Sequence, residues 1–266
     1  MLTTDPEYVA YQYADSEKLR IRIETHQRYT VGEPDFQYTE LQHLQVQSGH
    51  RLLDVGCGPG RLQAVLTPLG VSMVGLDRSS GLLREARAAA PSAAWVRADA
   101  TALPFGDGRF DRVCALGVLY HVREWKRALE EMRRVARPGG RVIISTNGPL
   151  AMRRLLDLHH QAALDAGYTP AEPRGSWFHL DHLAQVRDVF PRAERDVVES
   201  TLEFPEPESA LRFYATNRID FLEDIPPDGS HRARLLPLVR RQIEEIIGRE
   251  GTFRVPKTYG YFVANL

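Results

Sequence analysis

The chain has 266 residues, of which 43% are hydrophobic and 26% are charged, and this is enough for one large α/β domain with a well-formed core. Its formal net charge of −1 gives no overall field that would attract nucleic acid or an anionic membrane, so a small-molecule partner is expected instead. A chain of this length needs no disulfide scaffold, and its two cysteines cannot by themselves build a structural zinc site.

Export and membrane insertion are not indicated. Residues 1–14 lack a basic segment followed by an apolar stretch, so no signal peptide is expected. The longest apolar runs, such as residues 113–120, are too short to span a bilayer. We therefore expect a cytoplasmic protein with no membrane partner.

Residues 1–48 are polar and lack strand-like runs. The stretch from Ser16 to Tyr29 predicts a helix that begins at a Ser N-cap, and a second helix is expected from Asp35 to Gln47. We interpret residues 1–48 as an N-terminal helical lid.

Residues 50–147 alternate between strand and helix. Strands are expected at residues 51–55, 71–77, 94–97, 110–116 and 141–145, and helices at 60–69, 79–90 and 124–136. Strands that alternate with helices pair in parallel through right-handed crossovers, so this pattern predicts a doubly wound sheet with helices on both faces.

Residues 148–266 are less regular. Helices are expected at residues 150–166, 179–190, 205–218 and 232–248, and strands at 195–204 and 252–263. We expect residues 205–249 to form a helical insertion or cap, and residues 49–204 and 250–266 to form the main α/β domain.

A glycine-rich loop, Gly56-Cys-Gly-Pro-Gly60, follows the first predicted strand. Its glycines allow the backbone to turn sharply and approach a ligand, and the following helix offers free N–H groups to a carboxylate or phosphate. The spacing differs from the dinucleotide-binding fingerprint, because the position three residues after Gly58 is Arg61 and not glycine.

The loop resembles motif I of the class I S-adenosylmethionine-dependent methyltransferases, of the small-molecule type with a methyltransferase type 11-like domain. Later motifs follow in that family's order: an acidic residue ends the second strand, Arg97-Ala-Asp-Ala100 follows the third, and residues 110–122 and 135–144 are similar to the fourth-strand motif and the turn into strand five. The resemblance implies a Rossmann-like, mostly parallel seven-stranded sheet with an antiparallel last strand and added helical cap elements.

The resemblance also implies a cofactor site for S-adenosylmethionine, with S-adenosylhomocysteine as product. Asp77 would accept hydrogen bonds from both ribose hydroxyls, and Asp99 with the Ala100 backbone would bind the adenine amino group. The alternative is that these acidic residues only cap turns after strands. The predicted cofactor-binding residues are Asp54, Gly56, Cys57, Gly58, Asp77, Arg78, Asp99, Ala100 and Leu116.

Methyl transfer from a sulfonium is an in-line displacement, and a base is needed only where the acceptor atom begins protonated. His121, after the fourth strand, is the candidate base; the alternative is that it packs at the pocket rim. Arg22, on the first predicted helix, either meets the cofactor's carboxylate or lies on a solvated face. No metal site is expected, because His179, Asp181 and His182 lie near a helix start, where such residues more often cap.

Two other functions remain open at this point. One is a non-catalytic S-adenosylmethionine-binding module, and the other is an NAD-dependent oxidoreductase on a related sheet. The Asn/Asp-Pro-Pro-aromatic signature of nucleic-acid amino methylation is absent after the fourth strand, where residues 116–119 read Leu-Gly-Val-Leu. The acceptor, the atom methylated (O, C or N) and the oligomeric state are not indicated by the sequence.

Overall fold

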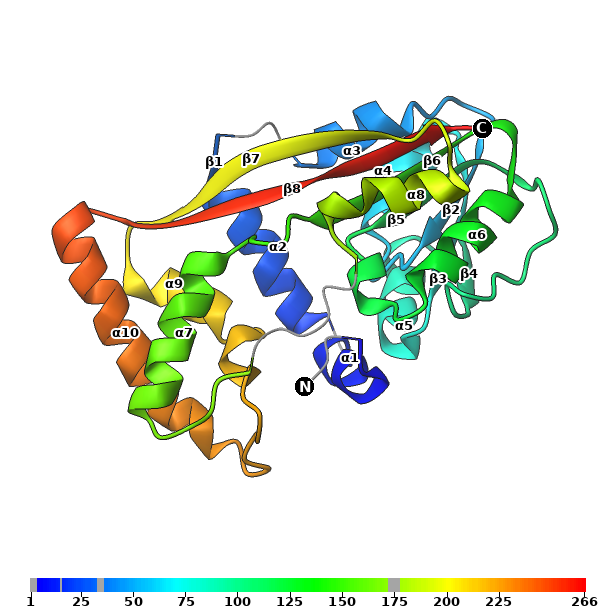
Figure 1. Cartoon of the computed structure of the whole chain (residues 1–266). Helices are drawn as coiled ribbons and strands as arrows, with labels where there is room; N and C mark the ends of the chain where they lie inside the picture. The colour runs from blue at the N-terminus through cyan, green and yellow to red at the C-terminus, as the bar shows by residue number, and fades with distance from the viewer. Residues whose placement is uncertain (1–3, 15, 33–35, 172–177) are drawn as a thin grey trace.

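The computed structural model describes residues 4–14, 16–32, 36–171 and 178–266 (Figure 1). Its strands are β1 (Thr30–Val31), β2 (Arg51–Val55), β3 (Ser72–Asp77), β4 (Ala94–Arg97), β5 (Phe110–Leu116), β6 (Ala136–Asn147), β7 (Glu194–Phe204) and β8 (Phe253–Asn265). Its α-helices are α1 (Pro6–Gln12), α2 (Glu17–Tyr29), α3 (Phe36–Leu44), α4 (Arg61–Leu66), α5 (Ser80–Ala89), α6 (Trp125–Val135), α7 (Arg153–Asp165), α8 (Leu183–Val189), α9 (Pro207–Tyr214) and α10 (Ser230–Glu250). Short 3-10 helices are η1 (Thr67–Leu69), η2 (Leu119–His121), η3 (Leu180–His182) and η4 (Arg218–Asp220).

The strands form one sheet in the order β1-β7-β8-β6-β5-β2-β3-β4. Strands β6, β5, β2, β3 and β4 pair in parallel, while β8 is antiparallel to both β6 and β7. The expected Rossmann-like α/β class with an antiparallel last strand is therefore confirmed. The two-residue β1, which pairs with β7, adds an edge strand that the sequence pattern did not predict.

Helices cover both faces of the parallel part of the sheet. Along β2, Leu53 and Val55 belong to a hydrophobic cluster with α6, whereas Leu52 belongs to a different cluster with α3 and α4. Alternate residues of a strand point to opposite faces, so burial of both sets places this strand between two helical layers.

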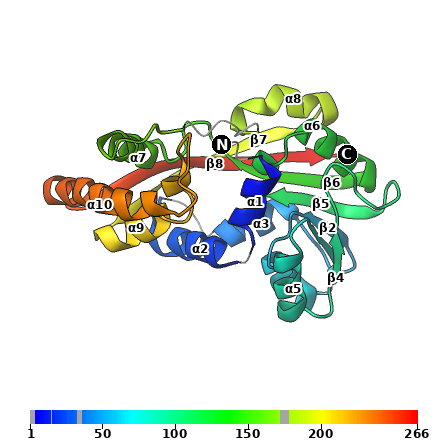
Figure 2. The same cartoon turned by 90° about the horizontal axis from the view of Figure 1, so that it is seen from below.

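The hairpin of β7 and β8 extends beyond the parallel strands and carries a group of helices at its far end (Figure 1). One hydrophobic cluster joins α7, α9 and α10 to the outer ends of β7 and β8, through residues that include Leu155, Phe204, Leu211, Leu235 and Phe253. Figures 1 and 2 both show α1 and α2 between this helical group and the parallel sheet. The molecule therefore has two packed parts, with the N-terminal helices between them.

Several expected bounds need correction. Ser16 precedes α2, but its backbone is helical, its side chain makes no capping hydrogen bond, and its N–H donates to Glu85 Oε1 at 3.2 Å. The helix expected from Asp35 is α3, although Asp35 itself lies outside the described residues.

Within the described ranges, no helix is long and apolar enough to cross a bilayer.

Candidate functional site: a glycine loop and a shared cavity

The glycine-rich loop has the left-handed backbone that its sequence predicts, with φ angles of +75° at Gly56, +55° at Gly58 and +80° at Gly60. The N–H groups of Gly56 and Cys57 both donate to the Leu76 carbonyl, at 2.7 and 3.0 Å, so the loop is tied to the neighbouring strand β3. A Cβ atom on Gly56 would lie 2.3 Å from a methyl carbon of Val118. Glycine is therefore required at position 56 by both backbone conformation and space.

Asp77 ends β3 directly beside this loop. Its two carboxylate oxygens accept hydrogen bonds from the N–H groups of Gly58 and Ser79, at 3.0 and 2.8 Å. Burial raises the pKa of Asp77, and these backbone donors partly oppose the rise. An ionised carboxylate has about four lone-pair sites, so these backbone donors leave Asp77 able to accept from a ligand's hydroxyl groups.

Asp54, at the end of β2, is almost fully buried. It accepts hydrogen bonds from Gln63 Nε2 at 3.1 Å and from Cys114 Sγ at 3.6 Å, and burial raises its pKa to about 6. Burial also raises the pKa of Cys57, so that thiol is neutral and is no nucleophile at physiological pH. Asp54 and Cys57 both line the cavity, and the hydrogen bonds of Asp54 join the end of β2 to α4 and β5.

Asp99 follows β4 and is half-exposed. One of its oxygens accepts from the backbone N–H and the hydroxyl of Thr101, at 2.9 and 2.8 Å, which is an Asx turn. The other oxygen faces Arg78 Nε at 3.5 Å. This outer oxygen remains accessible to a ligand, and Ala100 lies next to it, buried.

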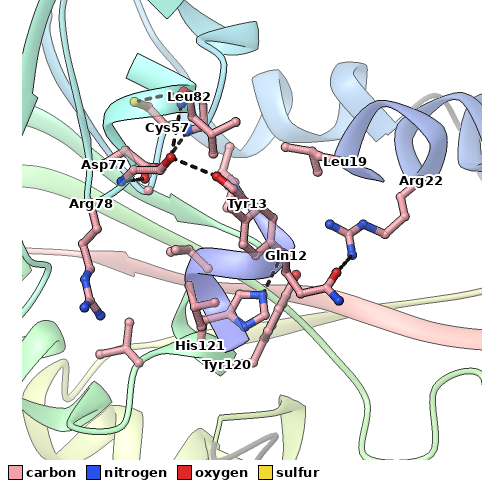
Figure 3. Close-up of a pocket in the computed structure, with 18 of the residues that line it drawn as sticks. Gln12, Tyr13, Leu19, Arg22, Cys57, Asp77, Arg78, Leu82, Tyr120 and His121 are labelled. Atoms are coloured by element: carbon pink, nitrogen blue, oxygen red, sulfur yellow. Dashed lines mark hydrogen bonds between the residues drawn. The ribbon is translucent and has the colours of Figure 1, made fainter. Parts of the chain in front are cut away.

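His121 lies at the end of η2, beyond β5, where the N-terminal segment reaches it. Its Nε2 atom lies 2.8 Å from the hydroxyl of Tyr13, and the two rings make an edge-to-face contact. Ser79 Oγ donates to the Tyr13 carbonyl at 2.9 Å, which ties the same segment to the start of α5. Figure 3 shows Tyr13 between Asp77 and His121 in the pocket. The N-terminal residues therefore form one wall of the site.

All of these groups line one cavity of about 1720 Å³. It brings together every predicted site residue: Asp54, Gly56, Cys57, Gly58, Asp77, Arg78, Asp99, Ala100, Leu116 and His121. Pockets for single small ligands typically measure about 300–1,000 Å³, so this cavity has room for a cofactor and an acceptor together.

The cavity also contains residues that sequence reasoning missed, above all Tyr8 and Gln12 of α1 and Arg218 of η4. A signal for α1 was present, since Asp5-Pro6 is a typical helix start and the Asp5 side chain does accept from Glu7 N at 2.9 Å. No local signal marks Arg218. Arg22 and His26 of α2 also line the cavity, where burial beside Lys257 lowers the pKa of His26 to about 3.

The histidines near residue 180 cap a helix, as the sequence indicated. His179 Nδ1 accepts from the N–H of Asp181 at 3.2 Å, and the N–H of His179 donates to His182 Nδ1 at 3.1 Å. Over the described residues, no group of three or more His, Cys, Asp or Glu side chains is arranged to hold a metal ion.

Comparison with known proteins gives related sequences and folds. Residues 53–144 match the family described as "Methyltransferase domain". A demethylmenaquinone methyltransferase of Beutenbergia cavernae is 41% identical over 105 residues, which cover 40% of this chain and 44% of the relative. Its counterpart from Renibacterium salmoninarum is 35% identical over 156 residues, which cover 53% of this chain and 66% of the relative. The chain thus spans less than two thirds of each of these relatives.

The solved structure of the [4+2]-cyclase SpnF aligns over 100% of this chain and 97% of its own length, with a TM-score of 0.58 and 18% identity, a likeness of fold alone. The matched segment 53–144 begins within β2 and ends within β6, so it contains the glycine loop, Asp77, Asp99 and His121. Residues 53–144 are therefore a methyltransferase domain, and the relatives of the chain include S-adenosylmethionine-dependent methyltransferases.

Proposed function

We propose that this protein transfers a methyl group from S-adenosylmethionine to an O, C or N atom of a small-molecule acceptor. The observation that carries the proposal is the convergence of Asp54, Asp77 and Asp99 around one glycine loop, on the wall of one cavity. Capping explains part of the bonding of Asp77 and Asp99, but it does not explain why three neighbouring strand ends open into a shared space of this size.

The residues present fit the cofactor. Asp77 can still accept from the ribose hydroxyls beside its backbone donors, and the outer oxygen of Asp99 with the Ala100 backbone suits an adenine amino group. A Cβ on Gly58 would have no neighbour closer than Leu19 Cδ2 at 3.7 Å, which leaves the loop open on the cavity side. When bound, the cofactor supplies an electrophilic methyl on a positively charged sulfur. The protein's part is to hold the acceptor in line with it, away from water.

His121 and Tyr13 provide a path for a proton where the acceptor starts as a hydroxyl or an acidic carbon. Burial raises the pKa of Tyr13, so its phenol stays neutral and can donate to His121 Nε2. As the methyl group is transferred, the acceptor's proton passes to the Tyr13 oxygen, and the Tyr13 proton passes to His121. His121 would then lose the proton to solvent, which returns both side chains to their starting state.

The fold by itself does not decide between methyl transfer and other uses of the same architecture, because a cyclase shares it. Calorimetry of the full chain with S-adenosylhomocysteine, and separately with NAD and NADH, tests which nucleoside binds. The expected result is binding of S-adenosylhomocysteine alone. Preference for a nicotinamide cofactor would overturn the proposal.

The role of Asp77 gives a sharper test of the same site. Asp77→Ala should weaken S-adenosylhomocysteine binding by about 1–3 kcal/mol, because two ribose hydroxyls lose their acceptor. Asp188→Ala, which removes an exposed carboxylate of α8 that does not line the cavity, should leave the affinity unchanged and serves as the control. Transfer of a radiolabelled methyl group into small-molecule extracts then separates an enzyme from a non-catalytic binding module, which would bind the cofactor without labelling any acceptor.

A further inference from the structure

Two guanidinium groups, those of Arg22 and Arg218, also line the cavity. Arg22 comes from α2 and lies with its guanidinium carbon 5.2 Å from the Tyr13 ring centroid, and Arg218 comes from η4 and lies 5.0 Å from that of Phe221. Burial lowers the pKa of Arg218, and the positive charge of Arg22 lowers it further, so the two cations act on each other across the cavity. Two like charges in one cavity repel each other, and an anion between them offsets this repulsion because it attracts both.

The described residues supply no such anion. Neither Arg22 nor Arg218 forms an ion pair with a described carboxylate. The acid nearest to Arg218 in sequence, Asp220, is already bound to His231 Nε2 at 3.0 Å and to Arg232 Nη2 at 2.6 Å. An anionic ligand in the cavity would supply the compensating charge.

Two hydrogen-bond donors at the same place are also unused. Arg22 Nη1 donates to Gln12 Oε1 at 3.4 Å, and this leaves Arg22 Nη2 and Gln12 Nε2 buried with no acceptor among the described residues. Figure 3 shows the Gln12 and Arg22 side chains joined in this way at the pocket wall beside Tyr13. Buried donors are normally paired, and a carboxylate or phosphate offers the several acceptor oxygens that this site lacks.

The position of this site favours the acceptor over the cofactor as its ligand. Both guanidiniums act on Tyr120, where they oppose the rise in its pKa that burial causes, and Tyr120 adjoins the candidate base His121. Arg218 lies on η4 among the C-terminal helices, whereas the cofactor-binding carboxylates lie at the ends of β2 and β3 and after β4.

We propose that the methyl acceptor carries a carboxylate or phosphate group, which binds between Arg218 and Arg22 with a further hydrogen bond from Gln12. This proposal rests on the methyltransferase function proposed above and names its substrate class. Asp220, held by α10, fixes η4, so Arg218 is positioned before the substrate arrives. Arg218 is then the residue that distinguishes anionic acceptors from neutral ones.

The test uses the full chain saturated with S-adenosylhomocysteine and follows by calorimetry the binding of inorganic phosphate, benzoate and the neutral isostere benzamide. Phosphate and benzoate should bind, and benzamide should bind at least about tenfold more weakly. Arg218→Gln should reduce the anion affinities at least about tenfold, while Arg218→Lys should retain part of them because it keeps the charge but not the paired donors. Arg241→Gln, which removes an exposed guanidinium of α10 outside the cavity, is the matched control, and thermal melts confirm that each variant folds.

The outcomes separate this proposal from the one on which it rests. If Arg218→Gln weakens S-adenosylhomocysteine but not 5′-methylthioadenosine, which lacks the amino-acid part, the anion is the cofactor's own carboxylate and the proposal is overturned. Equal binding of benzamide and benzoate, or no binding of either anion, also overturns it. Failure of S-adenosylhomocysteine to bind would refute the methyltransferase function instead, and the anion titrations would then be repeated on the chain alone, where the expected order of affinities is unchanged.

Discussion

Gly56 is constrained both by its left-handed backbone and by the close approach of the Val118 side chain. Gly56→Ala places a side chain at φ +75°, a conformation that costs an alanine about 1–2 kcal/mol, and a new Cβ 2.3 Å from Val118 Cγ2, 2.8 Å from Val118 Cβ and 3.0 Å from Val118 Cγ1. Forcing Val118 aside adds the cost of overpacking, about 1–3 kcal/mol. We expect a total loss in the free energy of unfolding of about 2–4 kcal/mol, since an alanine also restricts the unfolded chain slightly.

Gly139 provides the matched control. It has nearly the same backbone conformation, with φ +74°, but a Cβ placed there would meet nothing within 4 Å. Gly139→Ala should therefore show the backbone cost alone, about 1 kcal/mol after the gain from the restricted unfolded chain. The difference between the two variants isolates the steric contact with Val118.

Urea unfolding followed by circular dichroism measures both losses, and calorimetry with S-adenosylhomocysteine measures the effect on the loop. Adding Val118→Ala should relieve part of the loss in Gly56→Ala. The relief is partial because the Val118 Cβ remains, and it should appear as a coupling of about 0.5–1 kcal/mol in a double-mutant cycle. Equal losses at Gly56 and Gly139, with no coupling to Val118, would refute the steric argument.

Three further substitutions test other parts of the structure. Tyr13→Phe removes the hydroxyl that contacts His121 Nε2 and should lower kcat about 10²-fold or more for a protonated acceptor without changing cofactor affinity, whereas an unchanged kcat would exclude the proton path. Asp220→Asn breaks a buried ion pair with Arg232 and should cost about 3–5 kcal/mol in urea unfolding; a loss below about 1 kcal/mol would contradict it. Burial lowers the pKa of His159 to about 4, below the value near 6.5 of an unfolded chain, so its contribution to stability is complete above pH 6.5 and is lost as the pH falls toward 4. His159→Gln should therefore flatten the fall in unfolding free energy over this range by up to about 3 kcal/mol, and an unchanged slope would contradict the assignment.

The parallel strands were the best predicted elements. The expected ranges 94–97 and 110–116 are the bounds of β4 and β5 in the structure. Both are short runs that end at polar or glycine-containing turns, so the local pattern alone defines them. The glycine loop was also predictable, because its left-handed backbone favours glycine and the glycines can be seen in the sequence.

The start of β6 shows where local pattern fails. Arg137-Pro-Gly-Gly140 reads as a turn, and the strand was expected only from Arg141. In the structure the strand begins at Ala136, which pairs with Phe110, and the N–H of Gly139 donates to the carbonyl of Leu266 at 3.0 Å. Partners 26 and 127 residues away in the sequence decide this segment, and no window of a few residues contains them.

The proposed acceptor side of the cavity was also not predictable, because it too depends on contacts between residues that are distant in the sequence. Arg218 reaches the cavity because Asp220 bonds Arg232, and this contact joins η4 to the first turn of α10 across the turn between them. In the sequence, these residues look like ordinary surface charges beside helices. Only the folded chain shows that Asp220 is 3% exposed and that its bonds leave the neighbouring arginine facing the cavity.

The two ends of the cavity are built from different parts of the chain, and this affects how the protein could change its substrate. The proposed cofactor end is built from one continuous stretch, residues 53–144, whose loops are constrained by glycine geometry and by backbone donors to Asp77. The proposed acceptor end is assembled from α1, α2 and η4, which come from both ends of the chain. Substitutions at Gln12 or Arg218 can therefore alter acceptor recognition without touching the loop that holds the cofactor. Asp220 is the exception, because loss of its buried pair with Arg232 would move Arg218 and lower stability together, so it should tolerate substitution less well than the arginine it positions.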